Sequence, residues 1–242
     1  MSISVILNGY RRPENLKIQV ESLLSQSITP AEILYWQNQP PSGVIPDEKT
    51  ILSLNHCISS HNWGVWARFA YALNARSDYT CILDDDTIPG KDWLKNCVET
   101  YDKYPGLLGT IGLKFYPDYR SRYERFGWDG NNYETKQVDI VGHCWFFARD
   151  LLSVFWRELP PVNWNLRVGE DMHFSYMLQK YTKYKTWVPP HPSENKDLWG
   201  SIDGWTLGTK NSSASNEWKS MIIALDYYRD RGFKMISEEQ HT

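Results

Sequence analysis

Short apolar runs rich in β-branched and aromatic residues alternate with amphipathic segments over the first half of the chain. Each run has the length of a buried strand, and each amphipathic segment spaces its apolar residues as a helix does. The runs predicted as strands are Ile3–Leu7, Glu32–Gln37, Thr50–Leu54 and Tyr79–Leu83. The segments predicted as helices are a stretch that starts at Pro13, Gly64–Asn74 and Trp93–Tyr104. This alternation predicts an α/β fold with a mostly parallel central sheet flanked by helices.

The second half of the chain has a less regular pattern. Residues from Phe115 to Tyr133 are dense in Tyr, Arg and Trp and are predicted to form a loop at one wall of a cleft. Regular elements are predicted at Val138–Phe147, from Gly169 onward, at Lys185–Val188 and at Asn216–Tyr228. The Gly- and Ser-rich stretch Trp199–Ser213 predicts a lid over a ligand. Since no repeat or linker divides the sequence, a single domain over residues 1–242 is expected.

Composition narrows the class of protein. A net charge of −3 and a pI near 6.1 provide no basic surface for a nucleic acid, so none is expected as a partner. The four cysteines contain no C-x-x-C pair, which favours a reducing, cytoplasmic location for a soluble protein. No window is long and apolar enough for a transmembrane segment, and the N-terminus lacks the cationic flank of a signal peptide.

Three consecutive aspartates, Asp84, Asp85 and Asp86, follow the strongest strand pattern of the chain. In open α/β sheets, ligands bind beyond the carboxyl ends of the strands. Adjacent carboxylates repel one another and are costly to desolvate, so they favour a cation, and their oxygen atoms suit Mg²⁺ or Mn²⁺. An acidic turn left in water is the alternative.

Five motifs, in order along the chain, resemble those of glycosyltransferases with the GT-A fold, particularly the family-2-like and exostosin-like branches. They are Ile3–Leu16, Asn62–Arg68 leading into Asp84-Asp85-Asp86, Val138–Gly142, Gly169-Glu170-Asp171, and His191. Together they span nearly the whole chain. One departure is the first loop, where Asn8-Gly9 replaces the usual Thr or Ser.

The resemblance implies a Rossmann-like GT-A fold and a division of labour within it. About residues 1–115 would bind the nucleotide donor, and about residues 116–242 would bind the acceptor and carry the lid and the last helix. The implied ligands of an Mn²⁺ or Mg²⁺ ion are Asp86 and His191, and the implied catalytic residues are Asp171 and its neighbour Glu170. The residues implied to contact the donor are Asn8, Tyr10, Arg11, Asn62, Arg68, Asp84, Asp85, Gly142 and Lys210.

The implied function is metal-dependent transfer of a sugar from a nucleotide sugar, in particular a UDP-sugar, to a hydroxyl of a glycan or glycoconjugate. If the anomeric centre inverts, Asp171 would accept the proton of the acceptor hydroxyl. If the configuration is retained, the same carboxylate would stabilise an oxocarbenium-like centre. The residues do not decide between these two roles.

Other classes of protein share parts of this pattern. An aspartate-nucleophile phosphatase also has D-x-D after a strand, but it needs Thr or Val where this chain has Ile88. A sugar nucleotidyltransferase needs a glycine-rich basic loop, whereas residues 8–12 contain one glycine. A carbohydrate-binding protein would suit the twelve tryptophans and fifteen tyrosines, and a catalytically inactive homologue would share every motif.

Overall fold

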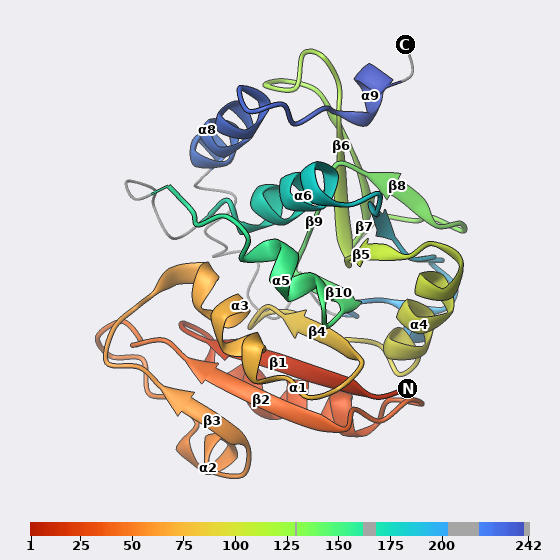
Figure 1. Ribbon diagram of the computed structural model, residues 1–242. Coiled ribbons are helices and arrows are strands. Elements are labelled where there is room, and N and C mark those ends of the chain that lie inside the picture. The colour runs from red at the N-terminus through yellow and green to blue at the C-terminus, as the bar shows by residue number, and fades with distance from the viewer. Residues whose placement is uncertain (129, 162–167, 203–217, 240–242) are drawn as a thin grey trace.

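The computed structural model describes residues 1–128, 130–161, 168–202 and 218–239 (Figure 1). The elements up to residue 103 are β1 (Ile3–Gly9), α1 (Pro13–Leu24), β2 (Glu32–Gln37), α2 (Glu48–Ile51), β3 (Asn55–Ile58), η1 (Gly64–Trp66), α3 (Ala67–Tyr71), η2 (Ala72–Asn74), β4 (Tyr79–Leu83) and α4 (Trp93–Lys103). The later elements are β5 (Gly106–Leu108), β6 (Ile111–Phe115), β7 (Tyr123–Gly127), β8 (Lys136–Val138), β9 (Ile140–Gly142), β10 (Cys144–Ala148), α5 (Leu151–Phe155), α6 (Glu170–Tyr181), β11 (Lys185–Val188), η3 (Lys196–Leu198), α8 (Trp218–Arg229) and α9 (Ile236–Glu239). None of the described helices combines the length and the apolar character needed to cross a membrane.

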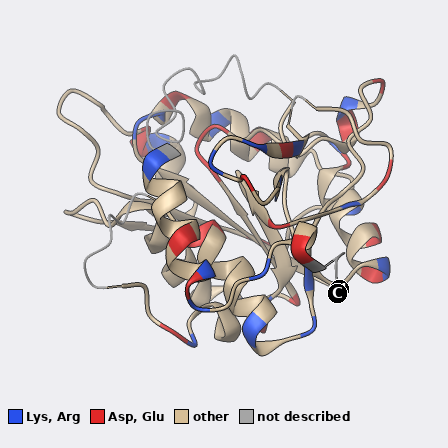
Figure 2. Ribbon diagram, turned by 90° about the horizontal axis from the view of Figure 1, so that it is seen from above, with Lys and Arg blue, Asp and Glu red and all other residues tan. Residues whose placement is uncertain are grey.

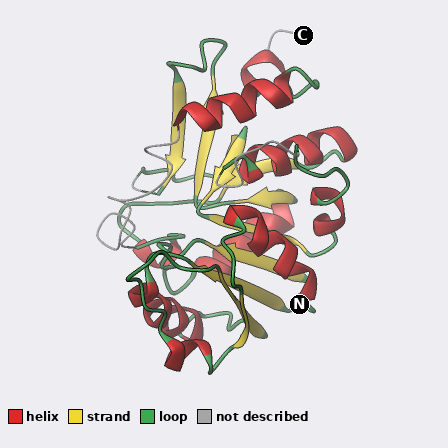
Figure 3. Cartoon of the chain, turned by 90° about the vertical axis from the view of Figure 1, so that its left-hand side faces the viewer, coloured by secondary structure: helices red, strands yellow, loops and turns green. Residues whose placement is uncertain are grey.

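The described strands form two sheets. The larger has eight strands in the order β3-β2-β1-β4-β10-β5-β11-β8, and the smaller has the order β7-β6-β9. In the larger sheet β3, β2, β1 and β4 pair in parallel, as do β5 and β11, whereas β10 and β8 run antiparallel to their neighbours. Figure 3 shows helices on both sides of these strands. The predicted α/β fold, with a mostly parallel sheet flanked by helices, is confirmed.

Strand β1 is buried on both faces, which explains its continuous apolar sequence. Ile3, Val5 and Leu7 share one core with α1 and α4, while Ile6 belongs to a second core that includes Phe69 of α3. Because side chains alternate along a strand, this one segment joins both helical layers. The layers fix the position of the strand ends, where the polar residues gather.

Helix α1 carries a stripe of amide side chains that holds the chain after β4. Gln19 Nε2 donates to the backbone carbonyls of Asp84 at 2.7 Å and Thr87 at 2.9 Å. Asn15 Nδ2 donates to the carbonyl of Asp85 at 2.9 Å. Asn15 and Gln19 are four residues apart, so they lie on one face of the helix, and both are buried. The aspartate turn is therefore attached to α1 through its backbone, and its carboxylates are left for other contacts.

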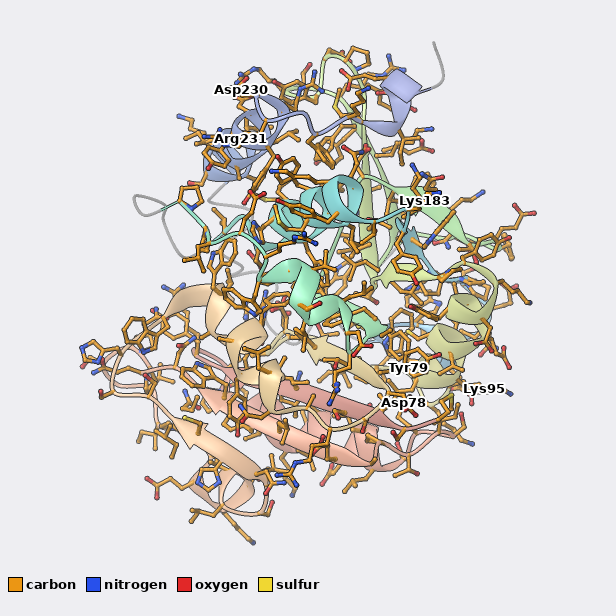
Figure 4. All side chains as sticks on the ribbon, viewed as in Figure 1. Asp78, Tyr79, Lys95, Lys183, Asp230 and Arg231 are labelled. Atoms are coloured by element: carbon orange, nitrogen blue, oxygen red, sulfur yellow. The ribbon has the colours of Figure 1, made fainter. Side chains whose placement is uncertain are left out.

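The carboxylates of Asp139 and Asp78 bind backbone N–H groups of segments that are distant in sequence. Asp139 Oδ2 accepts from the backbone N–H of Phe115 at 2.6 Å, and Oδ1 accepts from that of Ile236 at 2.8 Å. This pair of bonds joins the small sheet to the start of α9. At the other end, Asp78, labelled in Figure 4, accepts from the backbone N–H of Ser2 at 2.7 Å and so fixes the start of the chain beside β4.

The predicted strand at Thr50–Leu54 is wrong. Residues 48–51 form the short helix α2, and the strand β3 comes later, at Asn55–Ile58. The cause is local capping: Asp47 accepts from the backbone N–H of Thr50 at 3.2 Å and from its hydroxyl at 2.6 Å. A side chain that caps a helix in this way outweighs the β-branched composition of the segment.

Two predictions for the second half also need correction. The stretch from Phe115 to Tyr133 is not all loop, because β7 pairs with β6 within it. The run Val138–Phe147 is not one strand, because it passes from β8 through β9 to β10, interrupted at Asp139 and His143. Strands β8 and β10 lie in the large sheet and β9 in the small one, so the chain changes sheet at these two polar residues.

The remaining predicted elements lie close to their observed bounds. Strands β2, β4 and β11 have the predicted residues, and α6 begins directly after Gly169. Helix α8 is described from Trp218, while residues 216 and 217 lie outside the described part. The division into donor and acceptor halves near residue 115 stays a prediction. All four cysteines are free thiols, and the cellular compartment stays a prediction.

Candidate active site

The three aspartates after β4 lie at the carboxyl edge of the large sheet, next to the turn between β9 and β10. His143 forms that turn with a left-handed backbone, at φ 62°. Its carbonyl accepts from the backbone N–H of Asp84 at 2.9 Å and from the hydroxyl of Thr87 at 3.0 Å. The aspartate turn is thus held by the β9–β10 turn on one side and by α1 on the other.

Two arginines bind the aspartates. Arg68, on α3, is buried and donates through Nη1 to Oδ1 of Asp84. Arg12, just before α1, donates through Nη1 to Oδ1 of Asp85 at 2.5 Å, and its Nη2 lies 3.5 Å from Oδ2 of Asp86. Each guanidinium compensates part of the negative charge that the sequence concentrates here.

His143 lies between the first and third aspartates. Its Nδ1 is 3.2 Å from Oδ1 of Asp86 and 3.8 Å from Oδ2 of Asp84. One ligand atom from each of these three residues lies within 4.8 Å of the others, and among the described residues no other group of His, Cys, Asp and Glu side chains meets this condition. Carboxylate oxygens suit Mg²⁺ and Mn²⁺, and an imidazole nitrogen is a common ligand of divalent transition-metal ions. The donor set therefore fits a divalent ion. We call Asp84, Asp86 and His143 the Asp-Asp-His group.

The electrostatics of this group reflect burial and opposite charges in competition. Burial lowers the pKa of His143, but the charges of Asp86 and Asp84 outweigh it, so the pKa is raised overall. For Asp86, burial raises the pKa, but His143 and Arg12 together bring it below the ordinary value. Burial prevails for Asp85, whose pKa rises to about 6 despite Arg12. The group thus holds a strong carboxylate beside a basic imidazole.

Helix α6 presents two acidic residues to the same region. Gly169 precedes the helix with φ 98°, a left-handed conformation that glycine adopts without strain. Glu170 Oε1 accepts from Nη2 of Arg68 at 2.6 Å, so one guanidinium joins Glu170 to Asp84. Burial raises the pKa of Glu170 to about 8 and that of Asp171 to about 6, against the charge of Arg68 in both cases.

Residues 4–156, more than half of the chain, match the sequence profile of glycosyl transferase family 2. The chain belongs to this family. The protein is therefore a glycosyltransferase, and the matched segment contains the triple aspartate, Arg68 and His143. This membership sets aside the phosphatase and nucleotidyltransferase interpretations. No curated protein sequence matches the chain.

Solved structures of S. aureus TarS share the fold of this glycosyltransferase. A fragment of residues 1–349 in complex with UDP-GlcNAc aligns with a TM-score of 0.57 and 17% identity, over 93% of this chain and 65% of the fragment. The same fragment in complex with UDP gives a TM-score of 0.53 and 20% identity, over 78% of this chain and 58% of the fragment. A longer TarS structure gives 0.54 and 18%, and there the chain spans 35% of the neighbour's length.

The structure of the glycosyltransferase brings several of the predicted site residues together. Arg68 pairs with Asp84 and Glu170, and Arg12 pairs with Asp85 and Asp86. His143, next to both Asp84 and Asp86, joins the two sets into one network. Two residues of the first loop join it at longer distances: Asn8 Oδ1 accepts from Arg68 at 3.4 Å, and the backbone N–H of Arg11 donates to Asp85 at 3.4 Å. Gly142 directly precedes His143. Their roles toward a donor stay predictions.

Other predicted residues have contacts elsewhere. Asn62 is exposed and accepts from the backbone N–H of Gly64 at 2.9 Å, so it shapes the start of η1. The guanidinium of Arg11 lies over the ring of Tyr10, 5.1 Å from the centre of that ring. Lys210 and residues 203–213 of the predicted lid lie outside the described residues. The described residues just before that segment lie next to the aspartates. The backbone N–H of Ile202 donates to the carbonyl of Ile88, two residues after Asp86, at 2.8 Å.

The predicted metal ligand His191 is not part of the Asp-Asp-His group. It is fully buried, its Nε2 lies 3.2 Å from the carbonyl oxygen of Trp128, and its ring stacks on that of Trp199 with centroids 4.8 Å apart. Burial lowers its pKa to about 4. The role of His191 toward a metal ion stays a prediction.

Sequence reasoning missed His143 and Arg12 as site residues. His143 sits inside an apolar run, so only its polarity and its place after Gly142 distinguish it. Arg12 lies three residues after Gly9 and directly before Pro13, where an arginine is easily taken for a solvated helix start. Their partners are more than 50 residues away in sequence, so local pattern alone does not identify them.

Proposed function

We propose that this family 2 glycosyltransferase moves a sugar from a UDP-sugar to a hydroxyl of a glycan or glycoconjugate, with Mn²⁺ or Mg²⁺ as cofactor. The Asp-Asp-His group at the carboxyl edge of the sheet carries the proposal. TarS fragments of the same fold have been solved with UDP-GlcNAc and with UDP, which supports uridine as the nucleoside of the donor. Figure 2 shows basic and acidic segments interspersed, as expected for a small charged substrate rather than a polyanion.

Asp84, Asp86 and His143 would hold the divalent ion. Once bound, such an ion supplies Lewis-acid stabilisation of the charge that develops on the departing nucleoside diphosphate. Arg68 fixes the orientation of Asp84, and Arg12 fixes that of Asp85, which would contact the ribose or the donor sugar. The backbone bonds from α1 keep this arrangement in place before the substrate binds.

Asp171 is the catalytic base of the proposal. Its pKa of about 6 leaves it ionised at neutral pH yet more basic than an ordinary aspartate, which suits removal of a proton from the acceptor hydroxyl. Glu170 is bonded to Arg68 and has a pKa of about 8, so it is better suited to positioning Arg68 and Asp171 than to accepting the proton.

Titration calorimetry of the chain with UDP, GDP and CMP, each with and without Mn²⁺, tests the donor and the cofactor together. The expected result is that UDP binds most tightly and that Mn²⁺ strengthens its binding. Release of UDP from UDP-GlcNAc in the presence of candidate glycans then tests transfer. Binding of all three nucleotides with equal affinity, with or without the metal, would contradict the proposal.

A further inference from the structure

A groove lined by aromatic rings lies along α3, and none of the Asp-Asp-His group is among its lining residues. Its volume is about 420 Å³, within the range of roughly 300–1,000 Å³ that small-molecule sites occupy. Ala67, Ala70 and Tyr71 of α3 form its floor, while Trp36 at the end of β2 and Trp156 after α5 form walls. Because small side chains lie between large rings, the surface is concave.

Three tryptophans of this groove are fixed in orientation by their own N–H groups. Trp36 Nε1 donates to the side-chain oxygen of Asn38 at 3.0 Å, and Trp63 Nε1 donates to the hydroxyl of Ser59 at 2.9 Å. Trp156 Nε1 donates to a backbone carbonyl of α3 at 3.3 Å. Trp63 nevertheless has 52% of its surface exposed. What these rings offer to a ligand is therefore their faces, held ready at little entropic cost.

The described residues that line the groove carry no formal charge. A phosphate, a nucleotide or a cation would find no compensating side chain there, in contrast to the charged cluster on the inner side of the same helix. The one amide among the lining residues, Asn74, is exposed. Apolar ring faces with one amide beside them match the apolar C–H face of a neutral pyranose, whose hydroxyls stay in contact with water.

The position of the groove links it to the reaction site. Trp36 is the register partner of Asn8 in the β1–β2 pair, and Asn8 contacts Arg68. Ala67 and Arg68 are neighbours on α3, which packs against β1 and β2 (Figure 1). One short helix thus separates the aromatic groove from the carboxylate network.

We propose that this groove binds a neutral saccharide segment of the glycan acceptor, at a distance from the sugar residue that reacts. The assignment to the acceptor rests on the proposed function, whereas saccharide binding by the groove does not. A second copy of the chain and an apolar peptide are the alternative occupants of the groove. Either would bury the exposed ring of Trp63 in the absence of any saccharide.

The test follows the tryptophan indole N–H signals by NMR in the full chain, with signals assigned from single Trp-to-Phe variants. The probes are neutral cello-, chito- and malto-oligosaccharides, from the monosaccharide to the hexasaccharide. At least one series should shift the signals of Trp36, Trp63 and Trp156 in a saturable way, and affinity should rise with chain length. Trp63→Ala should weaken this binding by about tenfold, since it removes an exposed ring face from the site.

Tyr133→Ala is the matched control, because it removes another exposed ring, 64% accessible, outside the groove. It should leave the affinity unchanged. Asp86→Asn should also keep saccharide binding while it loses Mn²⁺ binding, so failure of the proposed function and failure of the groove are separable. The inference is overturned if no probe shifts the groove signals, if Trp63→Ala binds as tightly as the wild type, or if these signals change only with protein concentration, as in self-association.

Discussion

Two histidines contact Trp128, His143 partly buried and His191 fully buried, and they differ in what surrounds them. The ring of His143 is 4.1 Å from the ring of Trp128 and faces Asp84 and Asp86, which raise its pKa. His191 contacts the carbonyl of Trp128 and the ring of Trp199, and burial lowers its pKa to about 4. Burial alone does not make a histidine a metal ligand. Nearby carboxylates, which the first histidine has, are what make it suitable.

The largest effect is expected at Asp171, in the charged region that contains the Asp-Asp-His group, Arg68 and the acidic residues of α6. Asp171→Asn should lower turnover by roughly 10²- to 10⁴-fold, because the variant has no base to accept the acceptor proton. In the wild type, kcat/KM should rise with pH and level off above a pKa of about 6, where Asp171 is ionised. Steady-state kinetics over pH measure both. UDP binding in the variant should match the wild type, and a parallel loss of binding would assign Asp171 to the donor instead.

Asp86 should give the next largest effect. Asp86→Ala removes one proposed ligand and leaves His143 without its nearest carboxylate, 3.2 Å away. We expect the gain in UDP affinity produced by Mn²⁺ to fall by about 100-fold or more, since loss of even an outer-shell partner costs 10- to 100-fold. Calorimetry with and without the ion measures this gain. If Asp86→Ala kept the full gain, the charged region would not be a metal site.

Acid should lower the stability of the fold through His191. The pKa of His191 is about 4 in the folded chain and about 6.5 in an unfolded chain. As the pH falls from 6.5 to 4, the unfolded chain gains a proton that the folded chain does not accept, so stability falls, by about 3 kcal/mol from this residue. His191→Gln should flatten that part of the stability curve. Urea unfolding at several pH values checks it, and an unchanged slope would refute the assignment.

The smallest effect is expected at Gln19, whose amide supports the charged region from α1. Gln19→Leu leaves the carbonyls of Asp84 and Thr87 without this donor, at a cost of about 1–3 kcal/mol in unfolding free energy. Mn²⁺ affinity should fall by less than in Asp86→Ala, because the ligands are present but less well positioned. Lys17→Leu, at an exposed position of the same helix, is the control and should change neither quantity.

The sequence predicted much of the fold where local pattern and tertiary packing agree. Strands β2 and β4 have the predicted bounds, and the aspartates follow β4 as expected, because buried parallel strands are continuous apolar runs ended by polar residues. The run Val138–Phe147 failed for a physical reason. Asp139 bonds to the backbone of Phe115 and Ile236, and His143 bonds to the aspartate turn, so distant partners break the strand at both residues.

The same reason limited the prediction of the site. Asp84, Asp86, Arg68 and Glu170 were named from motifs, whereas the contacts of His143 with Asp84 and Asp86 depend on which residues face one another across the sheet. In the sequence, a histidine between two prolines resembles a metal ligand held in a rigid turn. In the folded chain its ring is enclosed by aromatic side chains, 4.8 Å from Trp199 and 6.4 Å from Trp93.

Electron paramagnetic resonance of Mn²⁺ during titration with the wild type, His143→Ala and His191→Gln tests the central claim most directly. The signal of free Mn²⁺ reports binding without any need for turnover or for the acceptor. The wild type and His191→Gln are expected to bind one ion with similar affinity, and His143→Ala is expected to bind it far more weakly. Strong Mn²⁺ binding by His143→Ala, together with its loss in a folded His191→Gln, would contradict the account.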